Sequence, residues 1–91
     1  MTDKITEILD ILQEECAEVI QAISKVRRFG MENTYKDGGT QREHLIQELG
    51  DVTLLIELLR AHQLFTDKEL HAAERRKSQK LTKWSTIYEQ D

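Results

Sequence analysis

The fold is decided first by residues 3–28, which read DKITEILDILQEECAEVIQAISKVRR. Apolar residues recur in this stretch at helical spacing and form one stripe. They are Ile5, Ile8, Leu9, Leu12, Cys16, Val19, Ile20, Ile23 and Val26. Phe29-Gly30 comes next, and glycine suits the left-handed conformation that ends many helices. The pattern therefore predicts one long amphipathic helix, with Cys16 as a small buried hydrophobic residue in its stripe.

Two more helices are predicted further along the chain. Residues 32–41 lack periodicity and contain Asp37-Gly38-Gly39, so we expect a loop there. A second helix is expected over residues 42–62, because apolar residues again share one side. They are Leu45, Leu49, Val52, Leu55, Ile56 and Leu59. Thr66-Asp67-Lys68-Glu69 matches a capping box and predicts the start of a third helix, which extends to about Tyr88.

Length and composition favour an all-α fold in a single domain over residues 1–91. Hydrophobic residues make up 38% of the chain and charged residues 33%, and there is no proline, a mixture that favours helices over strands. A lone domain of 91 residues buries only a modest fraction of its surface and is marginally stable. We therefore expect a homo-oligomer, either a homodimer or a homotetramer.

Charge and segment composition exclude several classes of protein. A net charge of −4 and a pI near 5.4 argue against broad adhesion to nucleic acid or to anionic lipid. The basic run at residues 74–80 is typical of a solvated helix face. The sequence has one cysteine, no apolar run of the ~20 residues that a membrane span requires, and no apolar signal-peptide core. We expect a cytoplasmic protein that binds neither nucleic acid nor a membrane.

Four acidic residues lie on or beside the predicted packing faces. On a helical projection Glu48 and Asp51 fall in the apolar arc of the second helix, and Glu15 and Glu18 fall on the shoulder of the first stripe. Burying an unpaired carboxylate costs many kcal/mol, so something cationic is expected to meet these side chains. When the two faces pack, four carboxylates converge. Such an oxygen-only cluster suits a hard cation, Mg²⁺ or Mn²⁺.

Two lysines are also placed where a structural helix would carry leucine or alanine. Lys77 falls on the centre line of the third helix's apolar stripe, and Lys80 falls on its shoulder. These lysines either pair with the carboxylates directly or bind phosphate groups that the cation also binds. Isolated acid pairs at this spacing are common on solvated helix faces. A buried salt-bridge network is therefore the structural alternative to a metal site.

The order of these motifs resembles a known enzyme family. Glu14-Glu15-Cys16-Ala17-Glu18, followed by Glu48-Leu49-Gly50-Asp51, is similar to the EExxE and ExxD motifs of the MazG-like all-α NTP pyrophosphohydrolase superfamily. The likeness covers roughly residues 8–60, with a weaker similarity at Lys80-Leu81 and Lys83-Trp84. It implies Mg²⁺-dependent hydrolysis of a nucleoside triphosphate between its α- and β-phosphates, which releases a monophosphate and pyrophosphate. It also implies a four-helix module that assembles as a dimer or tetramer, with neighbouring chains completing the site.

The resemblance also implies roles for individual residues. Glu15 and Glu18 match the first acidic pair, and Glu48 and Asp51 match the second, as catalytic residues and metal ligands. The substrate-binding residues expected on the third helix are Lys77, Lys80, Lys83 and Trp84. For Trp84 the residue pattern itself favours a core position beside Leu81 and Tyr88 over stacking on a nucleobase, because the three share helical spacing.

Some features depart from the family pattern or leave alternatives open. Ser78 stands where MazG-like proteins often carry asparagine, so the contact made at that position is in doubt. The Gly50-Asp51 pair fits MazG better than the related phosphoribosyl-ATP pyrophosphohydrolases, which tend to have alanines before the aspartate. That activity stays open, as does a non-catalytic helical interaction module. The presence of all four motif acids favours an enzyme over such a module.

Overall fold

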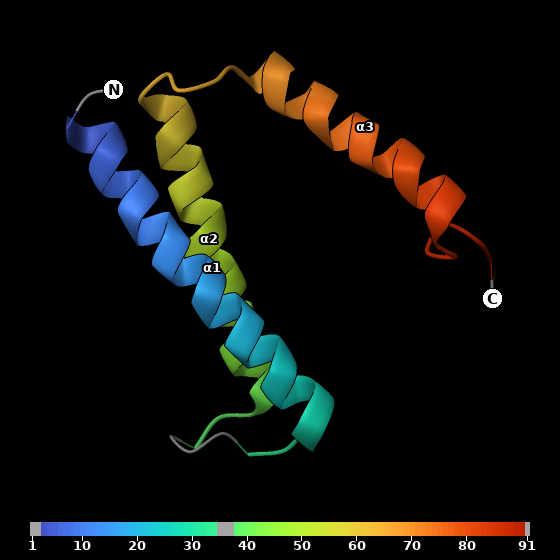
Figure 1. Cartoon of the computed structure of the whole chain (residues 1–91). Helices are drawn as coiled ribbons and strands as arrows, with labels where there is room; N and C mark the ends of the chain where they lie inside the picture. Colours follow the sequence, from blue (N-terminus) through green and yellow to red (C-terminus); the bar gives the residue numbers. More distant parts are fainter. Residues whose placement is uncertain (1–2, 35–37, 91) are drawn as a thin grey trace.

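The computed structural model describes residues 3–34 and 38–90, and it is all-helical (Figure 1). The helices are α1 (Asp3–Phe29), α2 (Gln41–Ala61) and α3 (Asp67–Trp84). This confirms the all-α part of the predicted fold class and the three predicted helices, whereas the described residues contain no fourth helix. Residues 35–37 of the predicted loop lie outside the described part. Within that part, no helix combines the length and apolar character that crossing a bilayer requires.

Local signals account for the ends of α1 and α2. Gly30 has a φ of 88°, and its N–H donates to the carbonyl of Val26 at 2.8 Å, so the predicted glycine stop is confirmed. α2 begins with a capping box in which Thr40 Oγ1 accepts from the N–H of Glu43 at 3.1 Å. The sequence analysis missed this box, although Thr40 and Glu43 have the same spacing as the pair recognised before α3. α2 ends before Gln63, which has a φ of 67°.

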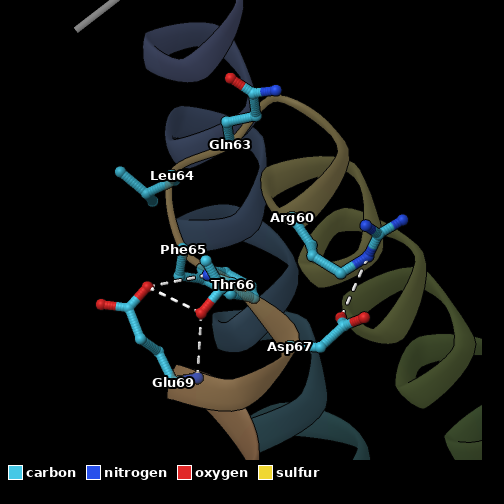
Figure 2. Close-up of a pocket in the computed structure, with 7 residues that line it drawn as sticks. All are labelled: Arg60, Gln63, Leu64, Phe65, Thr66, Asp67 and Glu69. Carbon is cyan, nitrogen blue, oxygen red and sulfur yellow. Dashed lines mark hydrogen bonds and ion pairs between the residues drawn. The ribbon is translucent and has the colours of Figure 1, made fainter.

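The capping box of α3 is confirmed, but its predicted C-terminus is wrong. Thr66 Oγ1 accepts from the N–H of Glu69 at 3.1 Å, and Glu69 Oε1 accepts from the N–H of Thr66 at 2.9 Å (Figure 2). α3 ends at Trp84 instead of continuing to Tyr88. Ser85 takes an extended backbone conformation, and its Oγ donates to the carbonyl of Leu81 at 2.8 Å. The backbone N–H of Ser85 donates to the same carbonyl at 2.9 Å, so this last helical hydrogen bond is kept and the extended backbone of Ser85 ends the helix.

α1 and α2 form an antiparallel hairpin, and α3 extends away from it (Figure 1). The core lies where the N-terminal half of α1 packs against the C-terminal half of α2. It consists of buried Ile5, Ile8, Leu55 and Leu59, with Leu9, Leu12 and Phe65 packed against it. α3 makes no comparable contact with either helix of the described chain. The radius of gyration is 16.1 Å, against about 12 Å for a compact domain of this length, so the protomer is open.

α1 packs on one edge of its apolar stripe instead of its centre. Glu15 is half-buried towards α2 and Ala22 is only 1% exposed, whereas Ile20 is 68% exposed. The predicted burial of Cys16 is therefore wrong, because its thiol lies on the uncovered side of the stripe. The rotation that exposes Cys16 is the same one that brings Glu15 into the helix interface.

Candidate metal centre

Three carboxylates from the two hairpin helices meet near the middle of the α1–α2 interface. Glu15 comes from α1, and Glu48 and Asp51 come from α2 at i, i+3 spacing. One oxygen from each side chain lies within 4.8 Å of the other two. The side chain of Glu48 is 13% exposed and Glu15 is half-buried, whereas Asp51 is exposed at the rim. The group is thus anchored inside the interface and open on one side.

Glu18 is the fourth acidic residue expected at the site, and it lies apart from the other three. It is one turn along α1 from Glu15 and is exposed. Among the described residues, neither carboxylate oxygen of Glu18 belongs to the group of oxygens from Glu15, Glu48 and Asp51 that lie within 4.8 Å of one another. The rotation of α1 explains this, because it turns Glu15 towards α2 and leaves Glu18 nearer to solvent.

The environment of the carboxylates is unfavourable to their negative charge. Glu48 Oε2 is buried and accepts no hydrogen bond from the described residues. Desolvation raises the pKa of Glu15, and the negative charges of Asp51 and Glu48 raise it further. Hydrogen bonds that a protonated Glu15 donates to these two carboxylates act in the same direction. A proton or a cation is therefore favoured at this position.

His44 is a neighbour of the acidic group that the sequence analysis did not select. Its Nε2 lies 3.7 Å from Oε1 of Glu48, one helical turn further along α2. The two side chains are 18% and 13% exposed, so the pair is largely shielded from solvent. The signal available in the sequence was the i, i+4 spacing of a histidine and a motif acid on one helix face.

The substrate-binding residues predicted on α3 are not near the acidic group within this protomer. Lys77, Lys80 and Lys83 are exposed, and neither Lys77 nor Lys80 forms an ion pair with the described acids of the hairpin. The salt-bridge alternative therefore finds no such pair in this protomer. Trp84 is 79% exposed, so the core position that its helical spacing favours is wrong in this protomer. Its ring lies 5.9 Å from Nζ of Lys83.

Ser78, the position that departs from the family pattern, contacts the C-terminal segment. Its hydroxyl lies 2.8 Å from the hydroxyl of Tyr88. This hydrogen bond folds the chain after α3 back along the helix, so Tyr88 is held beside α3 without being part of it. The Ser78 hydroxyl thus has a structural partner in the protomer.

A hollow lies at the turn between α2 and α3, away from the acids. Figure 2 shows its lining around the turn and the ion pair between Arg60 Nε and Asp67 Oδ1, 3.4 Å apart. The hollow has a volume of about 440 Å³. Its lining residues are Arg60, Gln63, Leu64, Phe65, Thr66, Asp67 and Glu69. Arg60 is roughly 13 Å along the axis of α2 from Asp51, so this hollow is separate from the acidic group.

The donor set of the acidic group fits a hard divalent cation. All three side chains offer carboxylate oxygens, the ligands that Mg²⁺ and Mn²⁺ prefer. Oε2 of Glu48 is buried and finds no hydrogen-bond partner in the described ranges 3–34 and 38–90, so it is the kind of atom that a cation would satisfy. Since three side chains do not fill an octahedral shell, positions remain for water and for phosphate oxygens.

Comparison with known families identifies the relationship of the chain. The model of the MazG nucleotide pyrophosphohydrolase domain matches residues 3–83. This range contains α1, α2 and all of α3 except its last residue, Trp84. No curated protein and no solved structure matches the chain in the corresponding comparisons. The matched range contains both acidic motifs and the lysines of α3.

Proposed function

The chain belongs to the MazG nucleotide pyrophosphohydrolase domain family, and from this premise we propose that it hydrolyses nucleoside or deoxynucleoside triphosphates. The family implies nucleotide pyrophosphohydrolase activity in general. In the proposed reaction, the oxygen of water bonds to the α-phosphorus and the bond to the α–β bridging oxygen breaks. The products are a nucleoside monophosphate and pyrophosphate. The cofactor is Mg²⁺, with Mn²⁺ as a substitute.

One observation carries this proposal: carboxylate oxygens of Glu15, Glu48 and Asp51 converge, and Oε2 of Glu48 is buried without a hydrogen-bond partner among the described residues. These side chains would hold the cation. When bound, the cation supplies positive charge for the phosphates and Lewis acidity for the attacking water. Glu18, one turn from Glu15, offers a fourth carboxylate, either to the cation or to the proton that the water loses.

The positive charges on α3 have a role in the same proposal. Lys77 and Lys80 would stabilise the pyrophosphate as it leaves, since ammonium groups bind phosphate oxygens. Lys83 and Trp84 would contact the rest of the nucleotide, because an exposed indole ring offers a face on which a base can stack. These residues must first be brought to the acids, which the protomer alone does not do.

We therefore propose a homodimer or homotetramer in which α3 of one copy reaches the acidic group of another. The support is the open shape of the protomer and the number of large apolar side chains that it leaves exposed. On the helices they are Ile11, Ile20, Ile23, Phe29, Ile46, Leu49, Leu54, Leu58 and Trp84. A second copy would cover part of this surface and complete the site at the same time.

The proposed reaction is tested with a substrate panel. Standard and modified NTPs and dNTPs, together with phosphoribosyl-ATP, are incubated with the protein and Mg²⁺, and pyrophosphate release is measured. We expect release from at least one nucleoside triphosphate and none after EDTA is added. Release from phosphoribosyl-ATP alone would assign the chain to that branch of the chemistry. No release from any substrate would favour the non-catalytic interaction module.

The shared site is tested by mixing two inactive variants. Glu48→Gln lacks an acidic ligand, and Lys80→Ala lacks a phosphate-binding group. If the site combines two copies, unfolding and refolding the variants together should restore about a quarter of wild-type activity, because half of the random dimers are mixed and each has one intact site. Each variant refolded alone is the control. Continued inactivity of the mixture would place both groups in one chain, and light scattering of a monomer would contradict the oligomer.

A further inference from the structure

The carboxylate of Glu48 has two oxygens in different surroundings. Oε1 lies 3.7 Å from Nε2 of His44, whereas Oε2 is buried and has no hydrogen-bond partner among the described residues. A carboxylate that turns about its side-chain bond exchanges these two positions. Any group that holds Oε1 therefore also decides where Oε2 lies.

His44 is well placed to hold that oxygen. It lies on the same helix as Glu48, one turn away. Its side chain is only 18% exposed, so its ring has limited freedom to move. Side chains that orient a metal ligand commonly lie in this position relative to the site, outside the ligand set but in contact with one ligand. Its ring nitrogens are not part of the group formed by Glu15, Glu48 and Asp51 in the described chain.

We propose that His44 is a positioning residue for Glu48. Its Nε2 holds Oε1 and thereby leaves Oε2 to the cation. The inference rests on the proposed function, since it assigns His44 a part in the same site. It goes beyond the acidic motifs, because neither EExxE nor ExxD includes this residue. The competing explanation is an ordinary i, i+4 pair, which would contribute only a little helix stability and would not affect metal binding.

Two substitutions separate these explanations. His44→Leu fills a similar volume without a donor, and His44→Gln keeps an N–H that can reach the same oxygen. The dissociation constant of Mn²⁺ is measured for each by electron paramagnetic resonance of the free ion, without nucleotide. We expect His44→Leu to bind Mn²⁺ about tenfold more weakly than wild type and His44→Gln to stay within about threefold. His71→Leu, an exposed histidine on α3, is the matched control and should bind like wild type.

Melting curves in EDTA show that each variant is folded before its metal binding is compared. Equal Mn²⁺ binding by wild type and His44→Leu would overturn the inference and leave the proposed function standing. Equal losses in His44→Leu and His44→Gln would also overturn it, because the donor would then not be what matters. Failure of the wild-type protein to bind Mn²⁺ would overturn the proposed function and this inference together.

Discussion

The two halves of the α1–α2 interface have opposite chemistry. At one end, Ile5 and Ile8 of α1 pack against Leu55 and Leu59 of α2 and exclude water. In the middle, the same two helices bring together carboxylates, one of which has a buried oxygen that accepts no hydrogen bond from the part of the chain that the structure describes. The apolar end therefore holds the hairpin closed, because burying aliphatic side chains is favourable. The acidic middle opposes closure until its charge is neutralised.

The two regions of this helix pair thus differ in role: the apolar contacts stabilise the hairpin, and the carboxylates are the proposed ligands of a cation. The buried aliphatic contacts keep α1 and α2 packed together although the carboxylates in the middle of the interface repel one another, because both sets of side chains lie on the same two helices. The binding energy of a cation then adds to the stability of the hairpin, as for any ligand that binds only the folded state.

The largest effect is expected at the apolar end. Leu59 is only 4% exposed, so Leu59→Ala removes buried methyl groups and leaves a cavity, at a cost of about 3 kcal/mol in the free energy of unfolding. Urea unfolding measures it. Leu54→Ala on the same helix is the matched control, because Leu54 is 55% exposed and its loss should cost far less. An equal cost at both positions would place Leu54 in a subunit contact.

The next effect concerns catalysis and not stability. Glu48→Gln and Asp51→Asn should each lower pyrophosphate release by about a hundredfold or more, because a ligand of the cation is lost. The melting temperature in EDTA should stay the same or rise, since one of three repelling charges is removed. An active Asp51→Asn enzyme would show that the acidic group is not the catalytic site.

The matched control for these variants is Glu57→Gln, which neutralises an exposed acid of α2 outside the group. It should leave both pyrophosphate release and melting temperature close to the wild-type values. If the acids instead serve in salt bridges, Glu48→Gln should lower the melting temperature, because a cationic partner would lose its counter-charge. The sign of the change in EDTA thus distinguishes a metal site from a structural ion pair.

The smallest effect is expected from the titration of Glu15. Its pKa in the folded chain is raised above the ordinary value of about 4.5 by desolvation and by the charges of Asp51 and Glu48. The folded state therefore binds this proton more tightly than the unfolded state does. Metal-free stability should be highest below the ordinary pKa and should fall as the pH rises through the raised one. Solvent screening keeps the effect small, because Glu15 is only half-buried.

Glu15→Gln tests this, with urea unfolding in EDTA at a series of pH values. The variant should lack the part of the decline that belongs to Glu15, and saturating Mg²⁺ should remove it from the wild-type protein as well. Glu14→Gln, a neighbouring exposed acid on the far side of α1, is the control and should keep the wild-type slope. The same slope in wild type and Glu15→Gln would mean that another group causes the pH dependence.

Much of this architecture could be predicted because helical signals are local. The apolar spacing before Phe29-Gly30 and the capping box at Thr66 each depend on residues within a few positions of one another. Both features are present in the structure. The end of α3 could not be predicted in the same way. The helix ends because the backbone of Ser85 is extended, and the serine side chain caps the last turn by donating to the carbonyl of Leu81, which the apolar pattern does not reveal.

The positions of the acidic residues depend in part on how α1 and α2 pack, which spacing within one helix does not determine. Helical periodicity selects Glu15, Glu18, Glu48 and Asp51 as acids beside packing faces, because the angle between side chains on one helix follows from their spacing. It does not state how far α1 turns against α2. That rotation depends on the side chains that interlock across the interface, and it decides that Glu15 joins Glu48 and Asp51 while Glu18 stays in solvent and Cys16 is exposed. The i, i+4 spacing of His44 and Glu48 can be read from the sequence, but only the packing of α2 decides that the pair is shielded from solvent.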